Sequence, residues 1–151
     1  MANFRFRLET LLKMRCDERD VQRHNYAKSL EAQRILLTQI ADVEQDITDT
    51  QQLLRAGSEP GTVDVDRLLR THRYELLLQV QRQQLDQQAQ RVAQEVERRR
   101  LQLLQADGEV RLLENLKERQ FAAFQHDELS REQKALDDIP RPADRVFDPS
   151  M

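Results

Sequence analysis

The sequence predicts an all-α fold, a long antiparallel two-helix coiled-coil hairpin with unequal helices. Three observations lead there. Of 151 residues, 34% are charged and 5% aromatic, with 3 Gly and no Trp, so strong helix formers dominate and little material remains for a sheet or a large core. Apolar residues recur at steps of three and four, and the interior holds one strong helix break.

The first helix is expected over about residues 5–55, which makes it roughly 75 Å long at 1.5 Å per residue. Its apolar side chains should form one narrow stripe, because their spacing of seven, three and four residues returns to the same helix face. The stripe is read as Leu30, Leu37, Ile40, Val43, Ile47 and Leu54.

A turn is expected over about residues 56–63, where the chain reads Ala-Gly-Ser-Glu-Pro-Gly-Thr from Ala56 to Thr62. Gly and Pro at this density end a helix and let the chain reverse. A fold-back about residue 60 would set Leu37 near residue 83 and Leu8 near residue 112.

The second helix is expected over about residues 64–138, roughly 110 Å. Two interleaved seven-residue series run along it for about five heptads, a narrow seam that suits a two-helix contact. One series is Leu78, Leu85, Val92, Arg99, Ala106 and Leu113, and the other is Arg82, Ala89, Val96, Leu103 and Val110. An isolated glycine, Gly108, lies within it and is tolerable in a long helix.

Polar residues interrupt both seams: Arg82 and Arg99 in the second helix, and Gln33 and Glu44 in the first. One reading is that their aliphatic stems pack while their polar heads reach water. The other is that they fix the register of the pair at some cost in stability.

The longer helix should extend some 20 residues past the shorter one, and an irregular, Pro-containing tail should follow over 140–151. Residues 1–139 would then form one hairpin domain. The overhang carries four large apolar residues without an obvious partner in the chain: Phe121, Phe124, Leu129 and Leu136. Such an end suits a partner site, with fraying or self-association as the alternatives.

The sequence holds no motif for catalysis, metal or cofactor binding. Phosphate-loop, dinucleotide and zinc patterns are absent, and the only cysteine, Cys16, has no histidine at suitable helix spacing. A two-helix rod offers no pocket to desolvate a carboxylate, so an enzyme is not expected. The net charge of −3 disfavours nucleic acid. With no apolar stretch long enough for a signal or a membrane span, a cytosolic protein without direct membrane insertion is expected.

Two segments carry a family resemblance. The opening Phe4-Arg5-Phe6-Arg7-Leu8-Glu9-Thr10-Leu11-Leu12-Lys13-Met14-Arg15 resembles the start of the flagellar export protein FliJ family. The segment from Leu113 to Gln120, followed by Glu128, Arg131 to Lys134 and Leu136 to Ile139, is similar to that family's C-terminal helix.

The resemblance implies a non-catalytic stalk of the flagellar type III protein export apparatus, similar to the central shaft of rotary ATPases. Implied partners are the hexameric export ATPase FliI, the cytoplasmic domain of the export gate FlhA, and export chaperones, at the periphery of the inner membrane. The candidate ATPase-facing residues are Phe4, Phe6, Leu8, Leu11, Leu12, Leu116, Phe121, Phe124, Glu132 and Leu136.

Two other functions stay open on the sequence alone. One is the equivalent ATPase stalk of a virulence-type injectisome. The other is a structural coiled-coil scaffold, which would form stable dimers or tetramers through both helices, whereas a stalk would be a monomeric hairpin.

Overall fold

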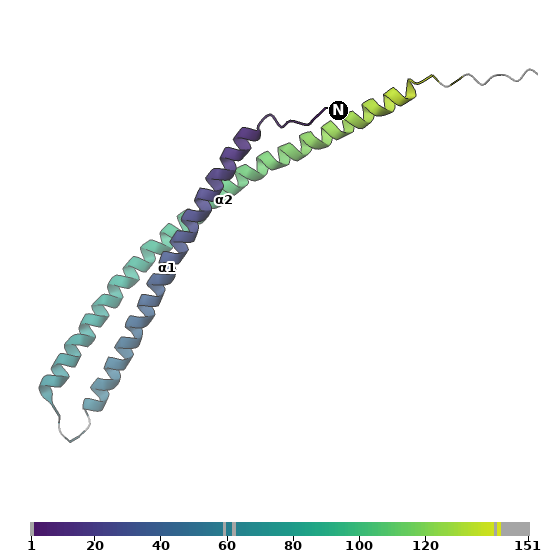
Figure 1. Ribbon diagram of the computed structural model, residues 1–151. Helices are drawn as coiled ribbons and strands as arrows, with labels where there is room; N and C mark the ends of the chain where they lie inside the picture. Colours follow the sequence, from purple (N-terminus) through teal and green to yellow (C-terminus); the bar gives the residue numbers. More distant parts are fainter. Residues whose placement is uncertain (1, 59, 62, 141, 143–151) are drawn as a thin grey trace, which may run out of the picture.

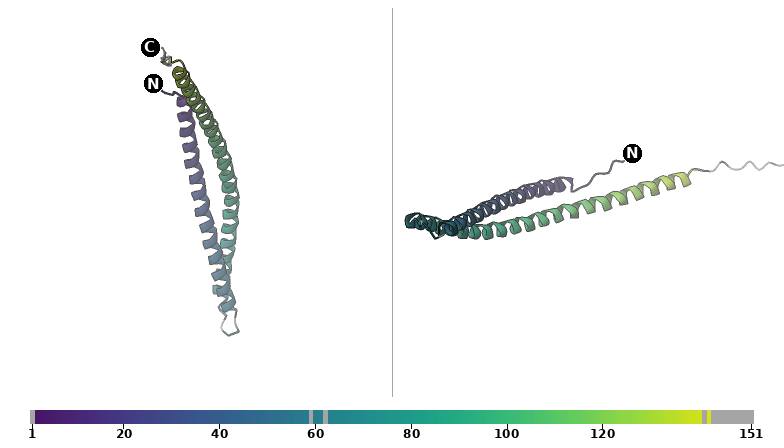
Figure 2. Two further views of the ribbon diagram at one scale, coloured as in Figure 1. Left: turned by 90° about the vertical axis from the view of Figure 1, so that its right-hand side faces the viewer. Right: turned by 90° about the horizontal axis from the view of Figure 1, so that it is seen from below.

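The computed structural model describes residues 2–58, 60–61, 63–140 and 142. Two helices, α1 (Glu9–Gly57) and α2 (Val65–Asp137), pack against each other along a narrow shaft (Figure 1). Two further views show the same antiparallel arrangement, and the right-hand one shows α2 continuing well past the start of α1 (Figure 2). The predicted fold class, an antiparallel hairpin of unequal helices, is confirmed.

Local chemistry explains where the chain turns. Asp64 caps α2, because its side chain accepts a hydrogen bond from the backbone N–H of Arg67 at 3.3 Å. α1 ends at Gly57, where a Cβ atom would lie 3.0 Å from the side chain of Leu68. A side chain at residue 57 would crowd that of Leu68, so glycine suits the close packing of these two residues.

Both outer helix ends differ slightly from the predicted positions. α1 begins at Glu9, not near residue 5, and residues 2–7 are not helical. α2 ends at Asp137, two residues before Ile139, whose position before Pro140 disfavours helix. The predicted irregular tail falls mostly on residues 141 and 143–151, which lie outside the described residues.

The seam of α2 is the predicted one. All six members of the first series and four of the five in the second are buried or half-buried. The exception is Arg82, an exposed residue whose guanidinium lies 3.0 Å from the Glu44 carboxylate across the seam. That ion pair joins two of the polar residues that the sequence singled out.

The seam of α1 corrects part of the prediction. Ile40, Val43, Ile47 and Leu54 are buried or half-buried as expected, but Leu30 and Leu37 are 40% and 55% exposed. Their neighbours take those places: Ser29 is half-buried and Leu36 is 7% exposed. Adjacent residues differ by about 100° around a helix, so only one of two neighbours can face the partner.

The register also differs from a fold-back about residue 60. Three cross-helix contacts, Lys117 with Glu9, Arg82 with Glu44 and Gln51 with Glu75, each have their midpoint at residue 63. Because α1 continues to Gly57 before the chain turns, residues of α1 face positions further along α2 than predicted.

Two apolar clusters hold the shaft, one at each end of the seam. Near the turn, Val43, Ile47 and Leu78 are buried, with Leu85 packed against them. At the other end, Phe6, Leu12 and Val110 form the core of a second cluster. Over 19–33, between the clusters, the seam of α1 is polar: Arg19, Gln22, Asn25, Tyr26, Ser29 and Gln33 are half-buried.

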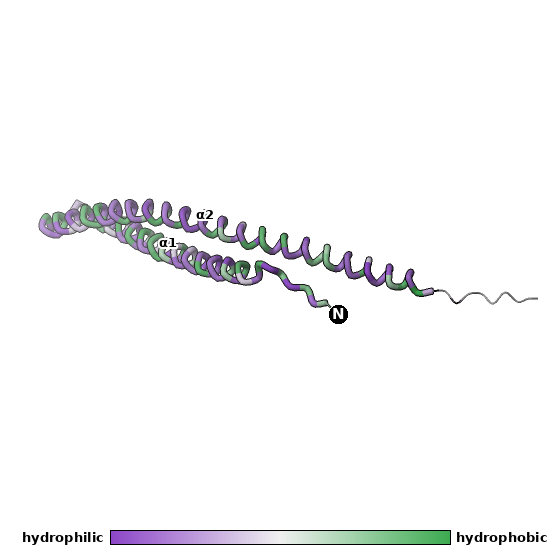
Figure 3. The backbone as a smooth tube through the Cα atoms, turned by 90° about the horizontal axis from the view of Figure 1, so that it is seen from above, coloured by the Kyte–Doolittle hydropathy of each residue, from purple (hydrophilic) through white to green (hydrophobic). Residues whose placement is uncertain are grey.

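Apolar and polar residues alternate along both helices without a long apolar stretch (Figure 3). Within the described residues, neither helix contains a segment apolar enough to cross a membrane.

Candidate partner-binding surfaces of the shaft

The chain begins with an extended arm that packs onto the seam. In Phe4-Arg5-Phe6-Arg7-Leu8 the apolar side chains are buried or half-buried while both arginines are exposed. Residues 4–6 have no regular secondary structure, and a turn at Arg7 and Leu8 then leads into α1, so the arm lays one side on the seam. Phe6 is 7% exposed and packs with Leu12 and with Val110, which is fully buried.

The tip of the arm reaches the base of the overhang. The ring of Phe4 lies 5.3 Å from that of Phe121 in an edge-on arrangement and 5.6 Å from that of Phe124. The prediction that these two overhang residues lack a partner in the chain is therefore wrong. The Lys117 ammonium lies 2.9 Å from the Glu9 carboxylate beside this contact. Together these contacts fix the arm against α2.

The ten candidate ATPase-facing residues separate into three groups by exposure. Phe6 and Leu12 are buried core residues. Five are half-buried in or beside the same cluster: Phe4, Leu8, Leu11, Leu116 and Phe124. The exposed ones are Phe121, Glu132 and Leu136. The structure thus brings most of these ten residues together at one end of the shaft. The exposed ones lie on the surface of the overhang.

The free part of the overhang presents large apolar side chains. Leu129, Leu136 and Ile139 are 66%, 67% and 60% exposed. A shallow groove between side chains near the end of α2 is lined by Glu132, Ala135, Leu136 and Ile139. Ile139 and Ala135 were not among the candidates, although their spacing from Glu132 and Leu136 already places them on one helix face.

A second apolar surface lies near the turn, on the side of α2 away from α1. We call it the tip face; it comprises Val65, Leu69, Leu76 and Val80, all between 49% and 62% exposed. Steps of four, seven and four residues keep these side chains on one face. The spacing of these four residues was present in the sequence. The sequence prediction, however, assigns the apolar residues of this segment to the seam, on the opposite face, through Leu78 and Leu85.

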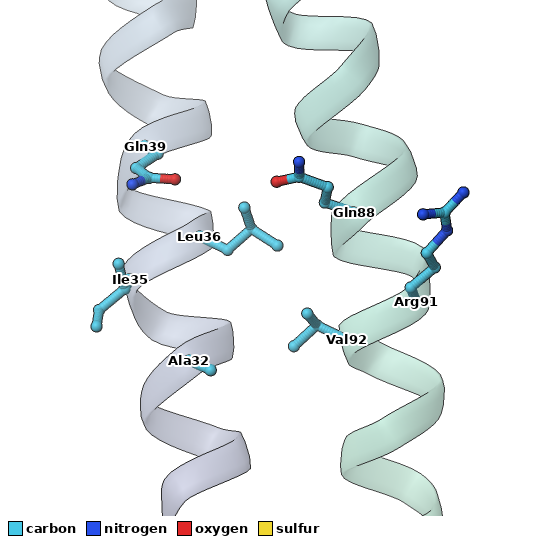
Figure 4. A pocket seen from close by; sticks show the side chains of 7 residues that line it. All are labelled: Ala32, Ile35, Leu36, Gln39, Gln88, Arg91 and Val92. Atoms are coloured by element: carbon cyan, nitrogen blue, oxygen red, sulfur yellow. The ribbon is translucent and has the colours of Figure 1, made fainter.

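A shallow groove also follows the seam midway along the shaft (Figure 4). Leu36 and Val92 point into the space between the helices, and Gln39 and Gln88 face each other above them. Ala32, Ile35 and Arg91 complete the lining. These side chains include no carboxylate, thiol, hydroxyl or imidazole, so the groove offers contact surface and no acid–base chemistry.

The basic run Arg98 to Arg100 is neutralised by its neighbours. Glu95 accepts hydrogen bonds from Arg98 and Arg99, both at 2.8 Å, and these bonds lower the pKa of its carboxyl group. Glu97 accepts two from Arg100, with the same effect on its own pKa. The run is therefore a paired, solvated surface and not a basic patch.

No site in the described part of the chain has the make-up of a metal centre. No group of three or more His, Cys, Asp or Glu side chains is gathered there as metal ligands. Cys16 is half-buried and packs against the cluster of Phe6, Leu12 and Val110.

A protein-family model described as "Flagellar FliJ protein" matches residues 4–141, which is nearly the whole chain and includes the arm, both helices and the overhang. The chain belongs to the FliJ family. Membership gives it a general role in flagellar protein export and fits a non-catalytic part in that process. No curated protein and no solved structure matches the chain.

Proposed function

We propose that this FliJ-family chain is a non-catalytic stalk that links the hexameric export ATPase FliI to the cytoplasmic domain of the export gate FlhA. The single observation that carries the proposal is the shape of the shaft with an exposed apolar surface at each end, the overhang at one and the tip face at the other. Exposed apolar surface on a slender rod suits protein contacts.

The overhang is the end proposed to meet the ATPase ring. From residue 118 onward, α2 runs beyond the start of α1, because Glu9 lies opposite Lys117. The last turns of that segment form a single helix with Leu129 and Leu136 well exposed. A single helix of this kind can enter a ring pore that a globular domain of equal mass cannot.

The tip face is proposed to contact the gate. α2 has 73 residues, about 110 Å at 1.5 Å per residue, so contacts at its two ends can be made at the same time across a wide gap. Through these proposed partners the protein would lie at the periphery of the inner membrane. Export chaperones are the remaining proposed partners, and the mid-shaft groove of Figure 4 offers them apolar contact area.

The stalk would act by binding alone. Different nucleotide states of the ring would contact the overhang differently, and that difference in binding free energy would couple the ring to the shaft. The rod supplies no reacting group in this account.

The proposal is tested by pull-down of the cognate ATPase with this chain, together with nucleotide turnover with and without it. We expect association and a change in turnover or hexamer formation. Two matched double variants test the overhang and the tip face separately. Leu129→Glu with Leu136→Glu should abolish ATPase association and preserve gate binding, whereas Leu69→Glu with Leu76→Glu should do the reverse.

All four leucines are at least 49% exposed, so neither double variant should unfold the hairpin. Circular dichroism checks this. Absence of any association with the ATPase, or loss of it through the tip-face variant alone, would contradict the proposal.

A further inference from the structure

A glycine in the middle of α2 has no packing reason within the hairpin. Gly108 lies in regular helix, where glycine costs about 1 kcal/mol relative to alanine. A Cβ atom built at this residue would meet no atom within 4 Å. Neither a turn nor a close approach of α1 therefore explains the missing side chain. Any close approach that it permits must come from outside the hairpin.

Exposed leucines surround this glycine. Leu101, Leu104 and Leu112 are 54%, 54% and 71% exposed. They lie seven and four residues before Gly108 and four after it, so all share its side of the helix. Val110, two residues from Gly108, is fully buried on the opposite side. We call Leu101, Leu104, Gly108 and Leu112 the glycine face.

We propose that the glycine face pairs with the glycine face of a second copy of this chain, the two α2 helices running nearly antiparallel with Gly108 at their crossing. In that arrangement a residue a given number of positions before Gly108 meets the residue equally far after Gly108 in the other copy. Leu104 of each copy then packs against Leu112 of the other, on both sides of the point of closest approach.

Two charged pairs beyond the leucines favour this antiparallel arrangement over a parallel one, although Asp107 meets Glu109 of the other copy, a like-charge pair, at the flank of the crossing. Glu97 meets Arg119 of the second copy, and Arg98 meets Glu118, each pair occurring twice by symmetry. A parallel pairing would instead set each of these charges against itself. Among the described residues, neither Arg119 nor Glu118 has an ion-pair partner within the chain, while Glu97 and Arg98 form only exposed pairs three residues apart, which are individually weak.

The tip face does not share this self-complementarity. An antiparallel pairing of its leucines and valines, Val65 with Val80 and Leu69 with Leu76, is centred between His72 and Arg73. Arg73 then meets His72 of the other copy at the centre of the contact, where the glycine face instead has its point of closest approach. A second copy therefore suits the glycine face better than the tip face.

The contact involves three leucines from each copy, less than obligate dimers use. The pair should therefore be reversible and separate on dilution, unlike a stable scaffold, and a single copy remains free to enter a ring. The proposal does not rest on the proposed function, because its test uses the isolated full chain.

Sedimentation equilibrium over micromolar to millimolar concentration tests the pairing. We expect the mass to rise from that of one chain toward that of two. Leu112→Arg should raise the dissociation constant by about tenfold or more. The matched control is Leu77→Arg, a leucine of α2 that is 67% exposed and lies outside the glycine face; it should leave the dissociation constant unchanged.

A charge swap gives a test that does not depend on apolar side chains. Arg119→Glu should weaken pairing, because Glu97 then meets a like charge, and adding Glu97→Arg should restore it. Circular dichroism confirms that each variant remains helical. A one-chain mass at every concentration, an equal loss with Leu77→Arg, or failure of the double swap to restore pairing would overturn the proposal.

Discussion

Two adjacent leucines of α1 give a sharp test of the seam. Leu36 is 7% exposed and faces Val92 across the shaft, whereas Leu37 is 55% exposed. We predict that Leu36→Ala destabilises the hairpin substantially and that Leu37→Ala does not. The two substitutions change the same side chain at neighbouring positions, so their difference reports the position of the seam.

The magnitude follows from the burial of Leu36. Replacing Leu by Ala removes three carbon atoms, worth about 0.8 kcal/mol each when buried, so the loss should be about 2.5 kcal/mol. This value lies at the lower end of the roughly 2–5 kcal/mol seen for buried leucines, because a groove already runs beside Leu36. For Leu37→Ala we expect a change within about 0.5 kcal/mol.

Thermal and urea unfolding, followed by circular dichroism, measure the change in unfolding free energy for each variant. The melting temperature should fall by roughly 5–10 °C with Leu36→Ala and by no more than about 2 °C with Leu37→Ala. Equal losses of stability, or a greater loss with Leu37→Ala, would contradict the structure, in which Leu36 faces α2. A greater loss with Leu37→Ala would support the sequence prediction that Leu37 does.

Three further predictions concern the arm, the polar middle of the seam and the acidic side of α2. Phe6→Ala should release the arm and cost about 3 kcal/mol or less, the low end for a buried phenylalanine, because a detached arm limits the loss; faster amide exchange of residues 4–8 at unchanged helicity would confirm it. Gln22→Leu should stabilise the hairpin by about 1 kcal/mol, because the Gln22 side-chain oxygen is buried without a hydrogen-bond partner; a lower melting temperature would contradict this. The pKa of Glu95 should lie below its ordinary value of about 4.3, so the stability that it contributes is present above that pH and is lost as pH falls through the lowered pKa. Carbon-detected NMR titration measures that pKa, and Arg98→Gln should raise it.

The fold could be read from the sequence because its signal is long and repeated. About five heptads of α2 share one phase, and a one-residue error would have exposed Leu78, Leu85 and Val110 together. In α1 the signal is weaker, since Leu36 and Leu37 are equally apolar and the seam before them contains Ser29 and Gln33. Where seam positions hold polar residues, the sequence no longer shows which residues of a helix face its partner.

The arm and its contacts could not be predicted in the same way. Phe4, Phe6 and Leu8 alternate with arginines over only five residues, too few to outweigh the helical pattern that follows them. Nothing local to Phe121 or Phe124 indicates a partner more than a hundred residues earlier in the chain. The overhang itself was predictable from the unequal helix lengths, but the packing of Phe4 against Phe121 and Phe124 at its base was not.

Site-specific photo-cross-linking at Leu136 tests the central claim most directly, that the overhang of this shaft contacts the export ATPase while the turn lies elsewhere. With the cross-linker at Leu136, the account predicts a covalent adduct with the ATPase hexamer, and with the same group at Leu77 it predicts none. An adduct from Leu77 and none from Leu136, or no adduct from either position, would contradict it.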